Sequence, residues 1–400
     1  MPCKVSFGEF LLSVVTFTAF VLLIGFTWEA GQSALPPPPI EHPYRRPPIR
    51  GHAGLYPRAA PLLDLKEVTY IVNSAVCDNS QNEILLLYLV FSHPSHWELR
   101  DAHRRHSSWK TLQELGARRV FLLADGSQIS QEGYPAVPMT TVLKESAKYR
   151  DVVVGSFRDH YRNLTYKHAM ALSWANQFCP NAHYIFKMDD DIMVDIWGIQ
   201  KLLKSGLVAD RSGVIQLLDP QREHKGDKLL DHEGTWAAGL VQMGLRPQRK
   251  KSKWKVTRSE FPGHIYPTYL SGWAYLITQP AASAILTAAS NNTPFWIDDV
   301  YITGVLATKA KVLRFALNPH YTLVTGAASC CIKDSFPKGP VILASSAAPL
   351  CNLLVAPSDK NVTLLSSWIN AARKCHQGKG CPDQDPESCP PTRPHFGVGT

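Results

Sequence analysis

The sequence predicts an α/β domain with a mostly parallel sheet, preceded by a single transmembrane helix. Three observations support this prediction: short runs of apolar residues, helix-forming stretches that alternate with them, and a charge-free stretch near the N-terminus. Hydrophobic residues make up 45% of the 400 residues and charged residues 19%, which is the balance of a globular protein with a sizeable core.

The first element is the charge-free stretch at residues 10–28. As a helix it just spans a hydrocarbon core of ~30 Å, and we favour an uncleaved signal anchor over a cleaved signal peptide. Under both interpretations the rest of the chain enters the secretory pathway. The predicted order is a cytoplasmic tail at 1–9, the anchor, a proline-rich stem at 29–65, a folded domain at 66–377 and a C-terminal tail at 378–400.

Three N-glycosylation sequons agree with this topology, and they begin at Asn163, Asn291 and Asn361. The nine cysteines include the adjacent Cys330 and Cys331 but no C-x-x-C pair. They fit either reduced thiols or disulfides, and the compartment decides between these alternatives.

Strands and helices alternate within the folded domain. Continuous apolar runs predict strands at Glu83–Phe91, Arg119–Ala124, Asp151–Val154 and His183–Lys187. Helical patterns predict helices at His103–Gly116, Leu164–Asn176 and Ala281–Ala289. Because the strand runs are apolar throughout rather than alternating, we expect a sheet that is covered on both faces.

The chain is basic, with a net charge of +9 and a pI near 9.0. Such a balance suits nucleic acid, an anionic membrane or an anionic substrate. The sequence has no zinc-finger spacing and no RNA-recognition signature, so nucleic acid is not expected as a partner. Seven basic residues lie in the segment 246–258, which is interpreted either as a solvated loop or as a cover over an anionic group such as a diphosphate.

Three consecutive carboxylates form the strongest local signal, in YIFKMDDDIMVD at residues 184–195. An apolar strand runs directly into Asp189, Asp190 and Asp191, at the end of a strand where α/β proteins bind ligands. The three charges repel one another, and hard divalent cations prefer such oxygen ligands. The alternative interpretation is an exposed acidic turn.

A second carboxylate pair lies in PFWIDDVYITG at residues 294–304. Asp298 and Asp299 stand between apolar residues, which raise carboxyl pKa values and so favour a general base. The alternative is a helix N-terminus, where acidic residues are stabilising, and both interpretations can hold together.

Two further features have weaker local signals. Gly272 would let the backbone approach a ligand closely, and the neighbouring Trp273 could stack on a sugar, although ordinary core packing explains both equally well. His320 follows a proline in a short turn and is a candidate metal ligand, whereas most lone histidines are not.

Taken together, these segments resemble the β1,3-glycosyltransferase family that includes β1,3-galactosyltransferases and β1,3-N-acetylglucosaminyltransferases. The resemblance runs from about Glu98 to Tyr321 and depends on several motifs in order. They are Phe157-Arg-Asp-His-Tyr161, Asn163-Leu-Thr-Tyr-Lys167, Trp174, Cys179, Lys187 with the three aspartates, Lys253-Trp254, Tyr266-Pro-x-Tyr269, Gly272-x-x-Tyr275 and Asp299-Val300.

This resemblance implies a single-pass type II Golgi membrane protein with a Rossmann-like nucleotide-sugar-binding catalytic domain facing the lumen. It implies a UDP-sugar donor, a glycan acceptor on a glycoprotein or glycolipid, Mn²⁺ (or Mg²⁺) as cofactor, and inversion at the anomeric carbon. It also implies residue roles. They are Asp299 as base; Asp189, Asp191 and His320 for the metal; Arg100, Arg104, Lys167, Lys187 and Asp190 for the donor; and Trp254, Tyr269, Gly272, Trp273 and Asp298 for the acceptor.

The chain departs from the family pattern at three places. Asp298 replaces the usual Glu, Ala274 replaces the second glycine of Gly-x-Gly-Tyr, and His103 replaces an Ile in the early arginine motif. Galactose is the first choice of donor sugar, with N-acetylglucosamine and N-acetylgalactosamine as alternatives. A catalytically inactive lectin-like or chaperone-like relative, a cytosolic nucleotide-binding enzyme and a homodimer also remain open.

Overall fold

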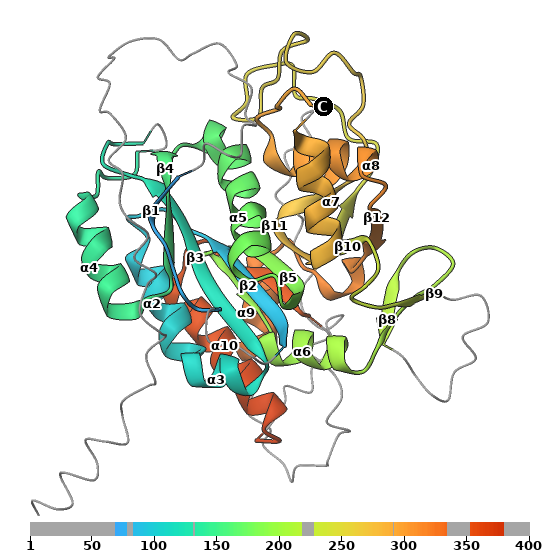
Figure 1. The fold of residues 1–400 in the computed structure, drawn as a ribbon. Coiled ribbons are helices and arrows are strands. Elements are labelled where there is room, and N and C mark those ends of the chain that lie inside the picture. The colour runs from blue at the N-terminus through green and yellow to red at the C-terminus, as the bar shows by residue number, and fades with distance from the viewer. Residues whose placement is uncertain are drawn as a thin grey trace, which may run out of the picture. The chain divides into compact units, whose positions relative to one another are not determined.

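The computed structural model describes residues 69–77, 83–130, 133–217, 228–290, 292–333 and 353–379. The predicted anchor and stem, Asn291, and the tail beyond residue 379 lie outside these residues. None of the helices within the described ranges is both long and apolar enough to cross a membrane. The described chain forms an α/β fold around one large mixed sheet (Figure 1).

The large sheet has eight strands in the order β1-β4-β3-β2-β5-β11-β10-β12. A two-stranded sheet pairs β13 with β6, and a three-stranded sheet has the order β8-β7-β9. The strands are β1 (Tyr70–Val72), β2 (Ile84–Phe91), β3 (Ala117–Asp125), β4 (Val152–Arg158), β5 (Ala182–Asp189), β6 (Ile192–Val194), β7 (Leu207–Ala209), β8 (Ile215–Leu217), β9 (Lys228–Leu230), β10 (Trp236–Gln242), β11 (Tyr269–Thr278), β12 (Leu313–Ala316) and β13 (Val355–Pro357).

The prediction of a largely parallel sheet holds for the centre of the large sheet. Strands β4, β3, β2 and β5 are parallel neighbours, so their carboxyl ends lie along one edge. Beyond β5 the sheet becomes mixed, because β11 runs antiparallel to both β5 and β10. The long connection from β10 to β11 contains the basic segment 246–258.

Helices cover both faces of the large sheet, as the apolar strand runs predicted (Figure 1). Helices α5 and α7 pack on one face, α3, α4 and α6 on the other, and α10 packs against α2. The helices are α2 (Trp97–His106), α3 (Trp109–Glu114), α4 (Met139–Tyr149), α5 (Leu164–Phe178), α6 (Ile196–Lys204), α7 (Gln279–Ala289), α8 (Ala307–Lys309), α9 (Thr325–Lys333) and α10 (Val362–His376), with short 3₁₀ turns η2 (Tyr161–Asn163) and η4 (Asn318–His320) and the π-helix η3 (Val300–Leu306).

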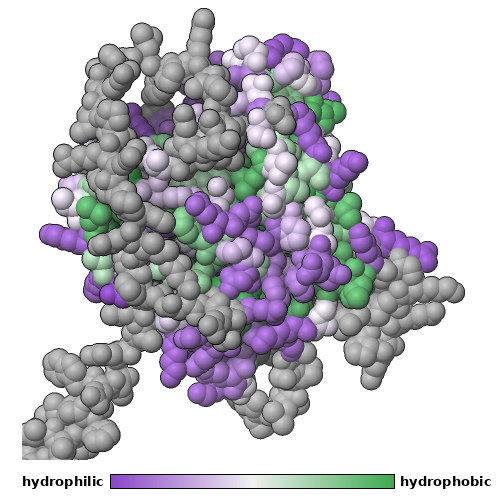
Figure 2. All heavy atoms as spheres, in the orientation of Figure 1, coloured by the Kyte–Doolittle hydropathy of each residue, from purple (hydrophilic) through white to green (hydrophobic). Residues whose placement is uncertain are grey.

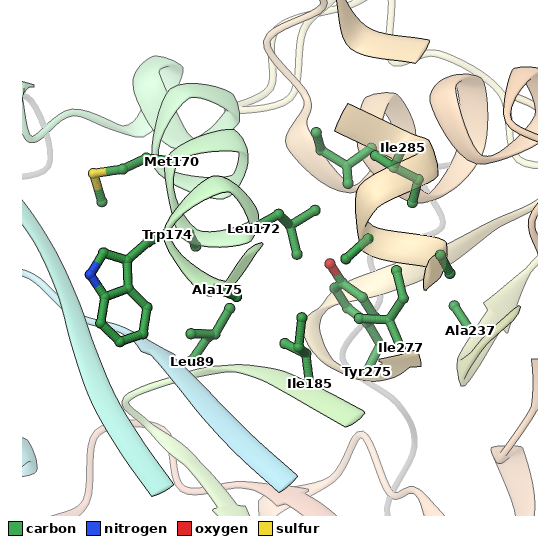
Figure 3. Packing of buried hydrophobic residues seen from close by; sticks show 14 of the residues in the cluster. Leu89, Met170, Leu172, Trp174, Ala175, Ile185, Ala237, Tyr275, Ile277 and Ile285 are labelled. Atoms are coloured by element: carbon green, nitrogen blue, oxygen red, sulfur yellow. The ribbon is translucent and has the colours of Figure 1, made fainter. Parts of the chain in front are cut away.

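Alternate residues of each central strand enter two separate cores. In β2, Leu87 and Leu89 face α5, whereas Leu86 and Tyr88 face the opposite core. Figure 3 shows Leu89 with Trp174 of α5 in the first core. This two-sided burial holds the strand ends in fixed positions, which a site built on them requires.

The predicted strands and two of the predicted helices are confirmed, but the single helix at His103–Gly116 is wrong. The chain instead forms α2 and α3 with a break at Ser107 and Ser108. The Ser108 hydroxyl accepts a hydrogen bond from the Thr111 N–H and so caps a new helix. Arg119 donates to the carbonyl oxygens of His103 and Ser107, which satisfies the end of α2.

A disulfide joins Cys77 to Cys179, and Cys330, Cys331 and Cys375 are also in disulfides. The Cys77–Cys179 bond ties the segment around β1 to the C-terminal end of α5. Disulfides persist in oxidising compartments, so the structure favours disulfides over reduced thiols for these cysteines.

Candidate active site

The three aspartates at the end of β5 do not point the same way. Asp189 is the last residue of β5, and its side chain is 40% exposed. Asp190 is buried, and its carboxylate accepts hydrogen bonds from Ser92 Oγ at 2.6 Å and His96 Nδ1 at 2.9 Å. The backbone of Asp190 is also held, because His103 Nε2 lies 2.9 Å from its carbonyl oxygen. The middle carboxylate is therefore part of the interior.

Asp191 is partly buried. Its carboxylate makes no hydrogen bond to any described residue, whereas its backbone oxygen accepts from the N–H and Oγ of Ser358. Burial and the charges of Asp190 and Asp189 raise the pKa of Asp191 to about 7. A carboxyl group in this state would be stabilised in its ionised form by a cation.

Lys187 connects this carboxylate cluster to the neighbouring strand β11. Its buried ammonium donates to Asp189 Oδ1 at 2.6 Å and to the carbonyl oxygen of Gly272. It also lies 4.1 Å from the centre of the Phe91 ring. The Lys187 ammonium thus links the Asp189 carboxylate to the backbone of β11.

Gly272 in turn holds Asp299. The Gly272 N–H donates to Asp299 Oδ2 at 3.2 Å, and the Val300 N–H donates to Oδ1 at 2.7 Å. Asp299 is the N-cap of the π-helix η3, a form that is frequent at functional sites. Asp189, Lys187, Gly272 and Asp299 therefore form one continuous chain of contacts across two strand ends.

Asp298 faces a different partner. Its Oδ2 accepts from His168 Nδ1 at 3.0 Å, and His168 Nε2 lies 2.5 Å from the Tyr275 hydroxyl. Burial lowers the pKa of His168 and raises that of Tyr275. The neutral ring then donates through Nδ1 and accepts from the tyrosine through Nε2. This relay keeps the Asp298 carboxylate turned toward His168.

The two adjacent carboxyl groups differ in their affinity for protons. Burial, followed by the charge of Asp298, raises the pKa of Asp299 to about 7. Burial is the largest influence on Asp298 and opposes its ionisation, but the His168 hydrogen bond, the charge of Lys187 and the Asp299 N–H together outweigh burial and lower the pKa of Asp298. A group that titrates near neutrality is suited to accept a proton from a substrate.

We expect Gly272→Ala to reduce turnover by about 10²-fold, the usual cost of misplacing a reacting group by about 1 Å. A Cβ at this position would lie 2.8 Å from the Asp299 Cβ, so the side chain would have to move. Steady-state kinetics should show the loss in kcat, with donor affinity retained. Ala274→Gly two residues further on is the control and should leave kcat unchanged. A normal kcat for Gly272→Ala would mean that the position of Asp299 does not limit the reaction.

Aromatic side chains border Asp298 and Asp299. Trp254 is 42% exposed, and its Nε1 donates to the Tyr161 hydroxyl at 2.6 Å. The Tyr161 ring lies 6.3 Å from that of Trp296, which precedes the acidic pair in sequence. Trp273 packs edge-on against Tyr321, with ring centres 5.4 Å apart. Trp254 is thus accessible to an acceptor, whereas Trp273 packs with Tyr321 against the opposite core of the sheet, and its contact with an acceptor stays a prediction.

Tyr269, in contrast, is buried at the start of β11 beneath η3. Its Cβ lies 3.1 Å from where a Cβ on Gly304 would stand. This position suits support of the acidic pair better than the predicted contact with an acceptor.

Three of the predicted donor-binding cations lie in the interior instead of in an open site. Arg100 is fully buried and donates to Glu145, Ser92 Oγ and the carbonyl oxygens of His93 and Pro94. Arg104 pairs with Glu145 and Asp151, and buried Lys167 pairs with Asp159. Direct contact with a donor would compete with these pairs, and the donor-binding role of the three residues stays a prediction.

His320 lies in η4, where its carbonyl oxygen accepts from the Leu354 N–H. Within the described ranges, no group of three or more His, Cys, Asp and Glu side chains is close enough to hold a metal ion. The carboxylates of Asp189 and Asp191 still fit a nucleotide-bound cation, because such ions commonly take one or two protein carboxylates together with phosphate oxygens. The His320 ligand role stays a prediction.

A polar cluster that the sequence did not predict lies beside Asp190 and Asp191. The rings of His93, His96 and Tyr134 have centres 4.7 to 5.6 Å apart, and Lys360 lies over Tyr134 and donates to its hydroxyl. The Nε2 atoms of His93 and His96 are buried and have no partner among the described residues. The position of both histidines directly after the β2 strand could have indicated a place in the site, because ligands bind at the carboxyl ends of such strands. Nothing in the sequence linked Tyr134 or Lys360 to them.

Protonation of His93 can be deduced from its contacts. Burial lowers the pKa of His93 to about 4, so the ring is neutral. Its Nδ1 accepts from the Ser95 N–H at 3.2 Å, which leaves the proton on Nε2. His93 therefore presents a buried donor with no acceptor among the described residues, which suits an oxygen of a ligand.

Two sequons lie within the described residues. Asn361 is exposed and caps α10, with its Oδ1 accepting from the Leu364 N–H. Asn163 is partly buried, and its amide donates to the Arg158 carbonyl oxygen at 2.9 Å. A glycan is easier to place on Asn361, and glycosylation of the three sites stays a prediction.

A family model described as Galactosyltransferase matches residues 99–318, more than half of the chain. The chain belongs to the galactosyltransferase family. The matched residues 99–318 include every residue that was predicted to be catalytic or to bind the donor or the acceptor. His320 and Lys360 lie after residue 318.

Individual relatives agree with the family assignment. Beta-1,3-galactosyltransferase 4 of Mus musculus is 32% identical over 271 residues, which are 63% of this chain and 69% of that protein. Lactosylceramide 1,3-N-acetyl-beta-D-glucosaminyltransferase A of Xenopus laevis is 28% identical over 250 residues, 60% of this chain and 58% of that protein. The expected relationship to β1,3-glycosyltransferases is confirmed.

One solved structure is also similar to this galactosyltransferase-family chain. It is a glycosyltransferase involved in the glycosylation of the major capsid of PBCV-1, at 8% identity and a TM-score of 0.32. The similarity covers 72% of this chain and 99% of that one. A likeness this distant says nothing about the site.

Proposed function

We propose that this chain transfers a hexose, with galactose as first choice, from a UDP-sugar to a hydroxyl of a glycan in β1,3 linkage. The observation that carries the proposal is the contact chain from Asp189 through Lys187 and Gly272 to Asp299. This chain of contacts links Asp189, the proposed metal ligand at the end of β5, to Asp299, the proposed base that directly precedes η3, and so supports the proposal. Family membership and the β1,3-transferase relatives support the same activity.

Asp189 and Asp191 would hold the divalent cation, Mn²⁺ or Mg²⁺, with His320 as a further candidate ligand. A bound cation would neutralise charge on the diphosphate and so assist departure of UDP. The sequence predicted that Asp190 contacts the donor, but we propose that this buried residue orients the acidic turn instead. Its bonds to Ser92 and His96 orient the turn that carries the two outer carboxylates.

Asp299 would take the proton from the acceptor hydroxyl as that oxygen attacks the anomeric carbon. One displacement then inverts the configuration, and no covalent intermediate is needed. Asp298 stays ionised beside His168, and its charge helps raise the pKa of Asp299 into the useful range. Lys187 limits repulsion between the base and Asp189, since it lies between them.

The cluster of His93, His96, Tyr134 and Lys360 would bind the nucleoside part of the donor. It adjoins Asp190 and Asp191 at the carboxyl ends of β2 and β5, where α/β sheets bind ligands. The unpartnered Nε2 of His93 supplies a donor for a ligand oxygen, and the aromatic rings offer apolar surface to a base.

We further propose a Golgi membrane protein with a luminal catalytic domain, anchored through residues 10–28. The disulfides and the kinds of relatives agree with this location. The anchor itself lies outside the described residues, so detection of the full-length chain in the membrane fraction, with its sequons glycosylated, is the test.

We expect the full-length chain, incubated with Mn²⁺, a panel of UDP-sugars and glycan acceptors, to release UDP only when a suitable acceptor is present. UDP-galactose should give the highest rate, and chelation with EDTA should abolish release. Product linkage should be β1,3. Metal-dependent UDP binding without turnover on any acceptor would instead identify an inactive, lectin-like relative.

A further inference from the structure

The basic segment 246–258 is held in an ordered conformation beside the candidate active site. Arg249 lies at its centre and donates to the carbonyl oxygens of Val256, Thr257, Phe261 and Gly263. The Val256 N–H donates a hydrogen bond to the Gln248 carbonyl oxygen at 2.8 Å. One of the seven basic side chains therefore pins the segment, which forms part of the yellow loops in Figure 1.

The other six cations of the segment project outward. Their side chains form no ion pair or hydrogen bond with the described residues, and all six residues are exposed: Arg246, Lys250, Lys251, Lys253, Lys255 and Arg258. The segment contains no acidic residue, and nearby Glu260 is engaged by Arg162 and Thr257. Hydrophilic residues are visible over this part of the surface in Figure 2. The result is a concentrated positive field on one side of the site.

Contacts connect this segment to the acidic pair Asp298 and Asp299 instead of to the cluster proposed to bind the nucleoside. Lys253 lies 4.3 Å from the ring centre of Trp254, whose Nε1 bonds to Tyr161, and Tyr161 packs on Trp296 just before the acidic pair. The segment connects β10 and β11, whereas His93 and His96 follow β2 on the other side of β5. The segment therefore lies near Asp298 and Asp299 through Trp254 and Tyr161, and Lys253 is the cation that these contacts bring closest.

We infer that the acceptor glycan carries an acidic group, a carboxylate or a sulfate, and that the exposed cations of the segment 246–258 bind it. Trp254 and Tyr161 would contact the sugar rings while the lysines meet the anion. This inference rests on the proposed function, because it assigns the acceptor side of that site. The segment then does not cover the donor diphosphate, which would lie at the metal ion held by Asp189 and Asp191.

An anionic membrane surface is the less favoured partner. The first described strand, β1, lies at one edge of the large sheet, and the segment follows β10 near the opposite edge. A patch that borders the catalytic carboxylates is also better placed to select a substrate than to hold a bilayer.

The test measures binding of soluble tetrasaccharides to the full-length chain in neutral detergent with Mn²⁺ and UDP. N-acetylglucosamine- and N-acetylgalactosamine-terminated acceptors are each used neutral, with a sialic acid branch, and with a sulfate. We expect an acidic form to bind about tenfold more tightly, the scale of several surface charge pairs. The variant Lys250→Gln, Lys251→Gln, Lys253→Gln should lose this preference while keeping its affinity for UDP. The sialylated and sulfated arms identify the acid.

A matched control removes three exposed lysines elsewhere, Lys110→Gln, Lys144→Gln and Lys379→Gln, and should keep the preference. Equal binding of neutral and acidic acceptors by the unaltered chain overturns the inference. A triple variant that loses UDP affinity instead overturns it in favour of the diphosphate, and one that loses only phosphatidylserine vesicle binding overturns it in favour of a membrane. Preferential binding without any sugar transfer keeps the inference and contradicts the proposed function.

Discussion

Asp191→Ala should abolish sugar transfer, with a loss of at least about 10³-fold, the scale of removing a metal ion that stabilises developing charge. Asp191 is partly buried just after β5, and no described residue forms a hydrogen bond with its carboxylate. Without it, Asp189 alone is left to hold the cation, and Lys187 already neutralises that carboxylate. Mn²⁺-dependent binding of UDP, measured by calorimetry, should disappear together with activity.

The Asp191→Ala variant should nevertheless fold. The contacts of Asp191 to Ser358 use its backbone oxygen, which alanine retains. Loss of one of three adjacent carboxylates also relieves repulsion, so the thermal unfolding temperature without metal should be unchanged or higher. Glu114→Ala, at an exposed carboxylate on α3, is the control and should leave both readouts unaltered. A folded Asp191→Ala variant that still binds UDP in a Mn²⁺-dependent way would remove Asp191 from the metal site.

Local sequence patterns were sufficient for the parts of the site that lie within one element. The apolar run before Asp189 predicted a strand that ends in carboxylates, and the apolar neighbours of Asp299 predicted a raised pKa. The strand prediction is confirmed, but the pKa prediction holds for Asp299 only, because His168 from α5 lowers the pKa of Asp298. What the patterns could not show is that the two motifs meet, since this depends on the antiparallel pairing of β5 with β11.

Hydrogen bonds and ion pairs between residues far apart in the sequence also determine which side chains are free to contact a substrate. Asp190 belongs to the same acidic run as Asp189 and Asp191, but hydrogen bonds from Ser92 and His96, which follow β2, hold its carboxylate in the interior. Arg100 and Lys167 had the chemistry of anion binders, but Glu145 and Asp159 engage them in the interior. Lys360 reaches Tyr134 across 226 residues. Composition and periodicity describe a residue's own element and carry no information about such partners.

Asp299→Asn should lower the rate of transfer by at least about 10²-fold, the usual scale for loss of general-base assistance. The amide is nearly the same size as the carboxylate, so donor binding should be nearly unchanged. It can still accept from the Gly272 N–H but offers no second oxygen to the Val300 N–H, a loss worth about 1 kcal/mol of stability. Rapid-mixing measurements of the chemical step, with UDP-sugar affinity measured in parallel, separate the two effects.

The pH dependence of kcat/KM decides which carboxylate accepts the proton. Only ionised Asp299 can act as base, and its pKa is raised to about 7, so the rate should increase with pH through about 7 and then level off. Asp299→Asn should remove this acid limb. Asp298→Asn should keep most of the activity but shift the limb to lower pH, because the charge of Asp298 contributes to the raised pKa of Asp299. An inactive Asp298→Asn with a nearly normal Asp299→Asn would transfer the base role to Asp298, and two nearly normal variants would exclude a carboxylate base at this motif.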